Sequence, residues 1–237
     1  GPDGFLYIVD MYRGIIQEGN WVRQGSYLRN VVQEYELDRN IGRGRIFRID
    51  HESTKRGPQP RMLDETPTEL VAHLSHLNGW WRSEAQKLII LHGDTSVVPQ
   101  LESEARSSEN PLARLHALWT LEGLGAVDSG LLAETFEDED ARVRAVAMRI
   151  SESVMASDRS LDGPIANLTA DQNPDVLIQT LLSVSRGGHP DAQKITESIV
   201  KANPENASIG NIAGQVKARM EAMIAERKKL EEIRRRN

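Results

Sequence analysis

The feature that most constrains this sequence is a helix-pair pattern that recurs from about residue 67 onward. Four amphipathic segments align on a small central residue, and these residues, Ala85, Ala117, Ala145 and Thr180, lie 32, 28 and 35 positions apart. A recurrence of this length, in which each unit is a pair of helices, is typical of an α-solenoid. The small residues allow close contact between neighbouring helices.

Each of these second helices follows a first helix. The apolar spacing predicts first helices over Pro67–Ser75, Ser96–Ser107, Ser129–Phe136 and Leu161–Leu168. Thr66-Pro67, Asn110-Pro111 and Asn173-Pro174 mark helix starts, because a capping residue precedes proline in the first turn. A fifth, weaker pair is expected after Pro190. The predicted fold is therefore mainly α, a solenoid of about four to five helix pairs that resembles HEAT repeats, preceded by a small β segment.

The β segment lies in the first 50 residues. The run from Phe5 to Val9 is apolar on both faces and predicts a strand covered on both sides. The run from Arg45 to Asp50 has Phe47 and Ile49 on one face and predicts an outer, half-exposed strand. Helical spacing over residues 28–35 predicts one helix between them. Fifty residues are too few to bury a core of their own.

Composition divides the chain into four segments: the β segment 1–50, a polar, proline-bearing linker 51–66, helical repeats 67–210 and a basic helix 211–237. From Gln215 to Asn237 there are eight Lys or Arg against four Asp or Glu, although the whole chain has a net charge of -6. Val216, Met220, Met223 and Leu230 form a thin apolar stripe that Arg227 interrupts, which predicts a solvated helix. The run Arg234 to Arg236 is interpreted as its end, the alternatives being contact with acidic lipid or nucleic acid.

The composition also excludes several classes of site. The 237 residues contain no Cys, which excludes a disulfide, a thiolate nucleophile and a covalently attached c-type haem within them. Neither an apolar run long enough to span a bilayer nor a signal peptide is present. The acidic balance argues against binding of nucleic acid by the chain as a whole. Because a strand motif follows directly on Gly1, the sequence is interpreted as an internal segment of a longer protein.

Two stretches carry a family resemblance. Residues 1–14, Gly-Pro-Asp-Gly-Phe-Leu-Tyr-Ile-Val-Asp-Met-Tyr-Arg-Gly, and the later run Gly42 to Ile49 resemble the closing section of the β-propeller in the membrane-bound dehydrogenases of planctomycetes and related bacteria. Residues 78–82 and 113–125 resemble the repeat region that follows that propeller. The resemblance covers most of residues 1–150.

The resemblance implies a larger parent protein. Its propeller would be similar to soluble glucose/sorbosone dehydrogenases, with a quinone cofactor such as PQQ, followed by a HEAT-like solenoid and a c-type cytochrome with a Cys-x-x-Cys-His haem site. Residues 1–50 would be the C-terminal end of the propeller, and the basic helix would lead into the cytochrome. The implied location is the periplasm or cell envelope. No cofactor is expected within this segment itself.

Asp10, Tyr12 and Arg13 are the candidate ligand-rim residues, because they follow a strand where propeller blades present side chains to a ligand. An acid, a phenol and a guanidinium could contact a metal, a quinone carboxylate or a sugar hydroxyl. The alternative is structural, with Asp10 capping the turn and Arg13 pairing with it.

The remaining candidates favour structural roles. His73 and His76 have a helical spacing that could serve a metal, but no third ligand is apparent and they are interpreted as surface residues flanking a buried face of Leu70, Leu74 and Leu77. Trp80, Trp81 and Trp119 are expected to pack between repeats, the alternatives being sugar stacking or an electron route. Arg82, Arg114 and Arg142 are expected to cap or pair between neighbouring repeats.

These observations lead to one hypothesis and one main alternative. The hypothesis is a non-catalytic scaffold in a bacterial quinoprotein-like dehydrogenase, joining a sugar- or alcohol-oxidising propeller to its cytochrome electron acceptor. The alternative is a HEAT-like protein-interaction module without a redox role. A carbohydrate-binding propeller remnant is a third possibility.

Overall fold

A computed structural model describes residues 1–15, 19 and 22–236, with only the backbone described for residues 227, 228 and 230–236. The chain is mainly helical, with a small antiparallel sheet near its N-terminus. It divides into two compact units, Gly1–Pro60 and Arg61–Asn237.

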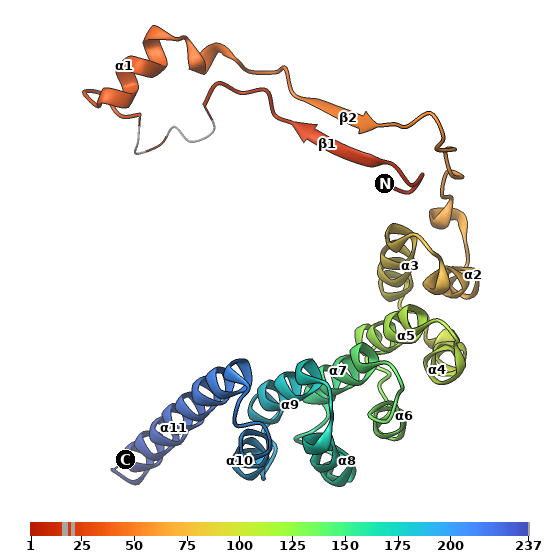
Figure 1. The fold of residues 1–237 in the computed structure, drawn as a ribbon, viewed down its shortest axis with the longest axis vertical. Coiled ribbons are helices and arrows are strands. Elements are labelled where there is room, and N and C mark those ends of the chain that lie inside the picture. The colour runs from red at the N-terminus through yellow and green to blue at the C-terminus, as the bar shows by residue number, and fades with distance from the viewer. Residues whose placement is uncertain (16–18, 20–21, 237) are drawn as a thin grey trace. The chain divides into compact units, whose positions relative to one another are not determined.

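The first unit is a two-stranded ribbon with a helical excursion between its strands (Figure 1). Strand β1, Leu6–Asp10, pairs antiparallel with β2, Arg45–Ile49, so that Leu6 lies opposite Ile49 and Asp10 opposite Arg45. Helix α1, Tyr27–Glu34, begins where the Ser26 side chain accepts the backbone N–H of Arg29. The two strands and the helix between them confirm the elements predicted for this part.

The predicted burial of β1 is wrong for this chain. Leu6 and Ile8 on one face are 62% and 46% exposed, and Tyr7 and Val9 on the other are 40% and 71% exposed. On strand β2, Phe47 and Ile49 lie on the same face as Leu6 and Ile8. They are also about half exposed. The reason is that the described part of this unit contains no layer that covers either face of the ribbon.

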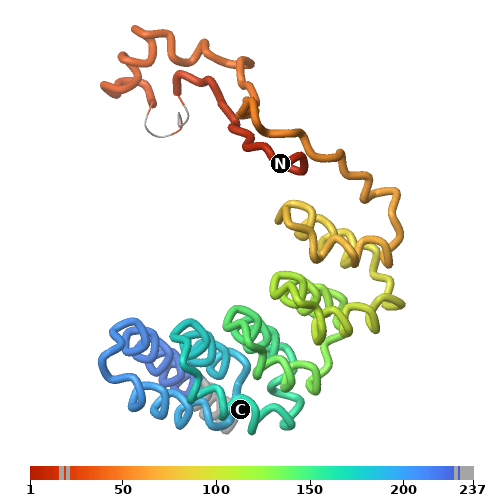
Figure 2. The backbone as a smooth tube through the Cα atoms, turned by 45° about the vertical axis from the view of Figure 1, so that its right-hand side comes forward, coloured from red at the N-terminus to blue at the C-terminus, as the bar shows by residue number. Residues whose placement is uncertain are grey.

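The second unit consists of consecutive helix pairs (Figures 1 and 2). Short 3-10 turns extend several of the first helices, which confirms the predicted first helices within a few residues. The helices are α2 Pro67–Ala72, α3 Gly79–His92, α4 Val98–Ser107, α5 Pro111–Gly123, α6 Ser129–Thr135, α7 Ala141–Ile150, α8 Asp162–Asn167, α9 Pro174–Arg186, α10 Ala192–Ala202 and α11 Ala207–Arg236.

The second helix of every pair begins in the same way. Its cap is an Asn or Asp whose side chain accepts a backbone N–H of the first turn, which satisfies one of the donors left free at a helix start. These caps are Asn78, Asn110, Asp140, Asn173 and Asn206. They lie 32, 30, 33 and 33 residues apart.

A buried small residue lies seven positions after each cap. These residues are Ala85, Ala117, Ala147, Thr180 and Ala213, each at most 2% exposed. The structure therefore corrects the sequence alignment, which used Ala145, a partly buried residue two positions earlier. A shift of two positions is a rotation of roughly 200° around a helix, so Ala145 lies on nearly the opposite face.

The second helices pack against one another in sequence order. Helix α3 contacts α5, α5 contacts α7, α7 contacts α9, and α9 contacts α11. Figure 2 shows these helices side by side in one row, with the first helices of the pairs in a second row next to them. One continuous apolar core, which includes Leu70, Leu118, Met148 and Ile199, extends through all five pairs. Trp81 is 6% exposed, and Trp80 and Trp119 pack at the edge of the core, which confirms their packing role.

Two expectations for this unit are wrong. Leu77 is 96% exposed rather than buried, because the chain leaves the helical path at His76, whose backbone is extended. The last helix begins at Ala207, and Ile209, Ala213 and Val216 are buried against α9 and α10. The helix is therefore solvated only beyond this packed part, where Met223 is 53% exposed. The predicted interruption at Arg227 and the apolar position Leu230 lie outside the described side chains.

Candidate functional site

The predicted rim residues lie at the end of the ribbon where β1 stops and β2 starts. Asp10 Oδ1 accepts the backbone N–H of Tyr12 at 2.9 Å, and Asp10 Oδ2 accepts Arg45 Nη2 at 3.1 Å. The Arg45 guanidinium lies 4.6 Å from the centre of the Tyr12 ring and 5.2 Å from that of Phe47. The charge of Arg45 is therefore shared among a carboxylate and two aromatic faces.

This cluster, Asp10, Tyr12, Arg45 and Phe47, contains one strained residue. Tyr12 has a φ of 40°, in the left-handed region that a bulky residue rarely adopts. The Asp10 bond to its N–H and the Arg45 contact with its ring hold it there. Such strain is often found at functional positions.

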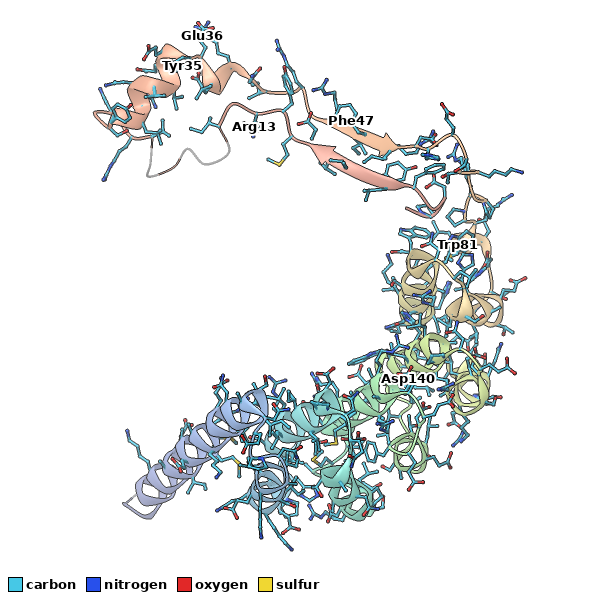
Figure 3. The ribbon with its side chains drawn as sticks, viewed as in Figure 1. Arg13, Tyr35, Glu36, Phe47, Trp81 and Asp140 are labelled. Carbon is cyan, nitrogen blue, oxygen red and sulfur yellow. The ribbon has the colours of Figure 1, made fainter. Side chains whose placement is uncertain are left out.

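The structure brings Asp10 and Tyr12 together but gives Arg13 a different place. The structural alternative predicted an Asp10–Arg13 pair, whereas the partner of Asp10 is Arg45 from the other strand. Among the described residues Arg13 has no ion pair, and it is exposed (Figure 3). Asp10 does cap the turn, as that alternative predicted.

At the opposite end of β1, sequence reasoning missed Asp3. Its side chain is nearly buried, accepts the Tyr7 hydroxyl at 2.7 Å and lies 3.5 Å from Arg56. The Tyr7 hydrogen bond lowers the pKa of Asp3 and raises that of Tyr7. The Asp3 carbonyl also accepts the N–H of Gly57, so this residue fastens residues 56–57 to the start of the ribbon. The turn composition of residues 1–4 was visible in the sequence, but the distant partner was not.

His73 pairs with a carboxylate, and His76 stacks on an aromatic ring. His73 Nε2 lies 2.7 Å from Glu65 Oε2, and the His76 ring stacks on Trp81 at 4.9 Å. His76 Nδ1 accepts the N–H of Asn78 at 2.9 Å. His76 therefore supports the first turn of α3, and the His73 ring lies 5.1 Å from that of Trp81 in the same turn. Within the described residues no group of three or more His, Asp or Glu could hold a metal ion.

A ladder of arginines and aspartates connects the middle pairs. Arg114 bonds both oxygens of Asp138 at 2.8 Å, and Arg144 bonds both oxygens of Asp171 at 2.7 and 2.9 Å. Arg144 also donates to the Asp138 carbonyl at 2.7 Å. Each arginine lies four residues after its helix cap, and each aspartate lies two residues before the next cap. One side chain thus links two successive pairs.

The prediction of pairing between repeats is confirmed for Arg114 and wrong for Arg142. Arg142 bonds Asp140, the cap of its own helix, and lowers the pKa of Asp140 to about 2. Burial acts to raise the pKa of Asp171, but the bonds from Arg144 and the Asn173 N–H outweigh it, and the pKa is lowered. The Asp171 carboxylate therefore remains charged.

The ladder is incomplete at its first position. Arg82 donates to the carbonyls of His76 and Leu77. The position two residues before the next cap, which holds an aspartate in the later pairs, is Ser108 here. Arg82 Nε is buried and has no hydrogen-bond partner among the described residues. Asn110 nevertheless bonds the Ser75 carbonyl across the same two loops, so these loops are close enough for a ladder contact.

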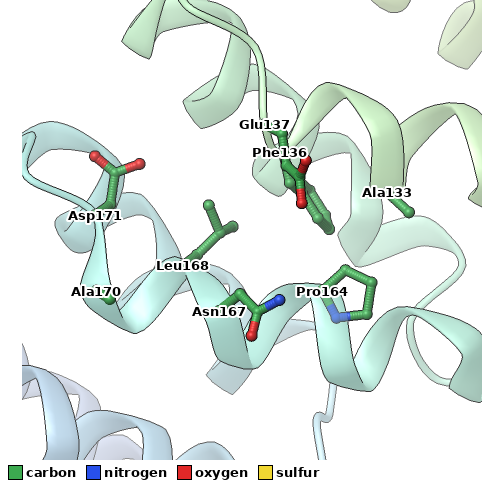
Figure 4. A pocket seen from close by; sticks show the side chains of 8 residues that line it. All are labelled: Ala133, Phe136, Glu137, Pro164, Asn167, Leu168, Ala170 and Asp171. Atoms are coloured by element: carbon green, nitrogen blue, oxygen red, sulfur yellow. The ribbon is translucent and has the colours of Figure 1, made fainter.

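Shallow grooves separate the first helices of neighbouring pairs. One of about 190 Å³ lies between α6 and α8 and is lined by Phe136, Glu137, Pro164 and Asn167 among others (Figure 4). A second, of about 220 Å³, lies between α8 and α10 and includes Asp162 and His189. The side chains that line the first groove include no buried polar atom without a hydrogen-bond partner. The second groove is lined by two residues that have such an atom, Asp162 (Oδ1) and His189 (Nε2).

Comparison with known proteins adds one finding for the first unit. Residues 1–53 match a family described as a domain of unknown function, DUF7133. No curated protein and no solved structure matches the chain. Among the described helices none combines the length and apolar character needed to cross a membrane.

Proposed function

We propose that this chain is a non-catalytic scaffold within a bacterial quinoprotein-like dehydrogenase of the membrane-bound type found in planctomycetes. Its first unit is the C-terminal end of a β-propeller, and its second unit is a HEAT-like solenoid that fixes the distance from that propeller to a c-type cytochrome. The solenoid interpretation is supported by the five caps at intervals of 30 to 33 residues and by the contacts between successive second helices.

The observation that carries the propeller interpretation is the ribbon itself. Both of its faces present large apolar side chains that stay about half exposed or more. A propeller blade has this character, because each of its faces packs against a neighbouring blade. The strands also coincide with the motifs that resemble the last section of a dehydrogenase propeller.

The cofactors of this function belong to the parent protein. A quinone such as PQQ would supply the oxidation chemistry in the propeller, and haem c would accept the electrons. The partners of this chain are then its own propeller and cytochrome domains, in the periplasm or cell envelope. Asp10, Tyr12 and Arg13 would lie at the rim of the propeller site. In that case Asp10 acts by holding Tyr12 and Arg45, and Arg13 is the member with a charge available to substrate.

The test uses the complete gene product and two electron acceptors. A soluble dye takes electrons at the propeller, whereas haem reduction requires the domains to be correctly spaced. Arg144→Met, which breaks the ladder, is expected to leave dye-linked turnover unchanged and to slow haem reduction at least roughly tenfold, equivalent to 1.4 kcal/mol in the barrier. Arg142→Met is the matched control and should change neither rate. Equal haem reduction in both variants would remove the spacing role, and a gene product without haem or turnover would favour the interaction-module alternative.

A separate experiment tests the rim. Arg13→Ala should raise the KM for substrate without changing the melting temperature, whereas Asp10→Ala should lower the melting temperature because Tyr12 and Arg45 lose their common partner. Unchanged kinetics in the Arg13→Ala, Tyr12→Phe and Asp10→Ala variants would exclude a rim role.

A further inference from the structure

His189 is a buried histidine on the connection between α9 and α10. Its side chain is 1% exposed and lies in the groove between α8 and α10. None of the proposed functions uses it. Its ring nitrogens make two different contacts, and these determine what protonation would do.

The first contact requires the ring to be neutral. His189 Nδ1 accepts the backbone N–H of Asp191 at 3.1 Å, and the His189 carbonyl accepts the N–H of Ala192 at 3.1 Å. Both bonds lie at the start of α10, whose cap residue, Asp191, makes no side-chain cap bond of its own. Because Nδ1 is an acceptor, the single proton of the neutral ring lies on Nε2.

The second contact is incomplete. His189 Nε2 lies 3.3 Å from Asp162 Oδ1 at the start of α8, yet the two atoms do not meet hydrogen-bond geometry. Both atoms are buried, and within the described residues neither has another hydrogen-bond partner. The link between α8 and the start of α10 is thus held by packing and by an imperfect polar contact.

Protonation would disturb the first contact and charge the second. A doubly protonated ring has a donor at Nδ1, which then faces the donor N–H of Asp191. Asp162 and Asp191 favour the charged ring, whereas Arg159 opposes it, and Lys194 lines the same groove. Burial is the largest influence, and it lowers the pKa of His189 below its ordinary value.

We propose that His189 is a pH-sensitive contact at the start of α10: when its ring gains a second proton, Nδ1 can no longer accept the Asp191 N–H, and the first turn of α10 opens while the rest of the unit stays folded. The groove next to His189 gives water a route to the ring as the helix end opens. The closed state favours the neutral ring, so protonation at low pH weakens closure. Closure is complete above about pH 6.5 and weakens below it.

Hydrogen exchange at the amides of residues 189–202 tests this proposal. After correction for the intrinsic pH dependence of exchange, these amides should exchange about tenfold faster near pH 5 than near pH 7.5, while those of α5 and α7 stay unchanged. His189→Asn keeps an oxygen that can accept the Asp191 N–H but does not titrate, so it should abolish the acceleration. His92→Asn, at the exposed end of α3, is the matched control and should behave like the wild type.

Two results would overturn the proposal. One is equal acceleration in the wild type and in His189→Asn. The other is no acceleration in the wild type, which would mean that Asp162 and Asp191 hold the charged ring in place. The melting temperature of His189→Asn near pH 7.5 shows whether the variant is folded, and a value equal to that of the wild type is expected.

Discussion

Arg144→Met tests the arginine and aspartate ladder directly. The Arg144 side chain is 17% exposed and Asp171 is 6% exposed, so the substitution leaves a buried carboxylate without its counter-ion. Removal of one partner from a buried pair costs about 3 to 5 kcal/mol. Two hydrogen bonds to the carbonyls of Asp138 and Glu139 are lost as well. We expect the free energy of unfolding to fall by at least about 3 kcal/mol.

The same helix supplies the control. Arg142 also bonds an aspartate through two nitrogens, but its side chain is 61% exposed. Exposed pairs contribute about 0 to 1 kcal/mol, so Arg142→Met should have little effect. Urea denaturation followed by far-UV circular dichroism measures both variants. Adding Asp171→Asn to Arg144→Met should recover part of the loss, because the buried charge is then removed. Equal losses for Arg142→Met and Arg144→Met would refute the reasoning.

Three further predictions concern single positions. Ser108→Asp should complete the ladder by accepting a hydrogen bond from Arg82 Nε, and it should add about 1 to 2 kcal/mol to the free energy of unfolding. Arg82→Met in the Ser108→Asp background should remove this gain. A gain that persists would contradict this account. The Asp140 carboxyl should titrate at about 2 by NMR, and Arg142→Met should raise the midpoint only part of the way toward the ordinary value, because the backbone N–H groups of residues 142 and 143 still bond the carboxylate. Since the folded pKa is the lower one, this pair stabilises above about pH 3.9 and the contribution is lost as the pH falls toward 2. Gly187→Ala should lower the melting temperature, since its Cβ would lie 2.7 Å from Met155 Sδ, whereas Gly210→Ala, in open space within α11, should raise it.

The helix pairs could be predicted because each has a local signal. Apolar spacing and the Asn-Pro starts mark α5 and α9 without any knowledge of their neighbours. The alignment between repeats was less certain, since residues 141–146 resemble residues 113–118 in composition and attract a match that is two positions out of phase. Alignment on the capping Asn or Asp corrects the phase and identifies Ala147 and Arg144 as the equivalent residues.

Long-range partners were not available from the sequence. Nothing near Asp10 indicates that its partner is Arg45, 35 residues away, rather than the neighbouring Arg13. The same holds for Asp3 with Arg56, and for His189, whose burial depends on how α8 and α10 pack. Exposure of the ribbon also could not be derived, because an apolar pattern specifies what a strand can bury against and not whether that layer is present.

The central claim is that this chain joins a propeller to a haem domain, and the sequence of the coding DNA on both sides tests it most directly. The account predicts a Cys-x-x-Cys-His motif within roughly 100 residues downstream, and upstream a signal peptide with further blade-like strand repeats. A reading frame that stops near Asn237 without a haem motif would contradict the connector function and leave an interaction scaffold.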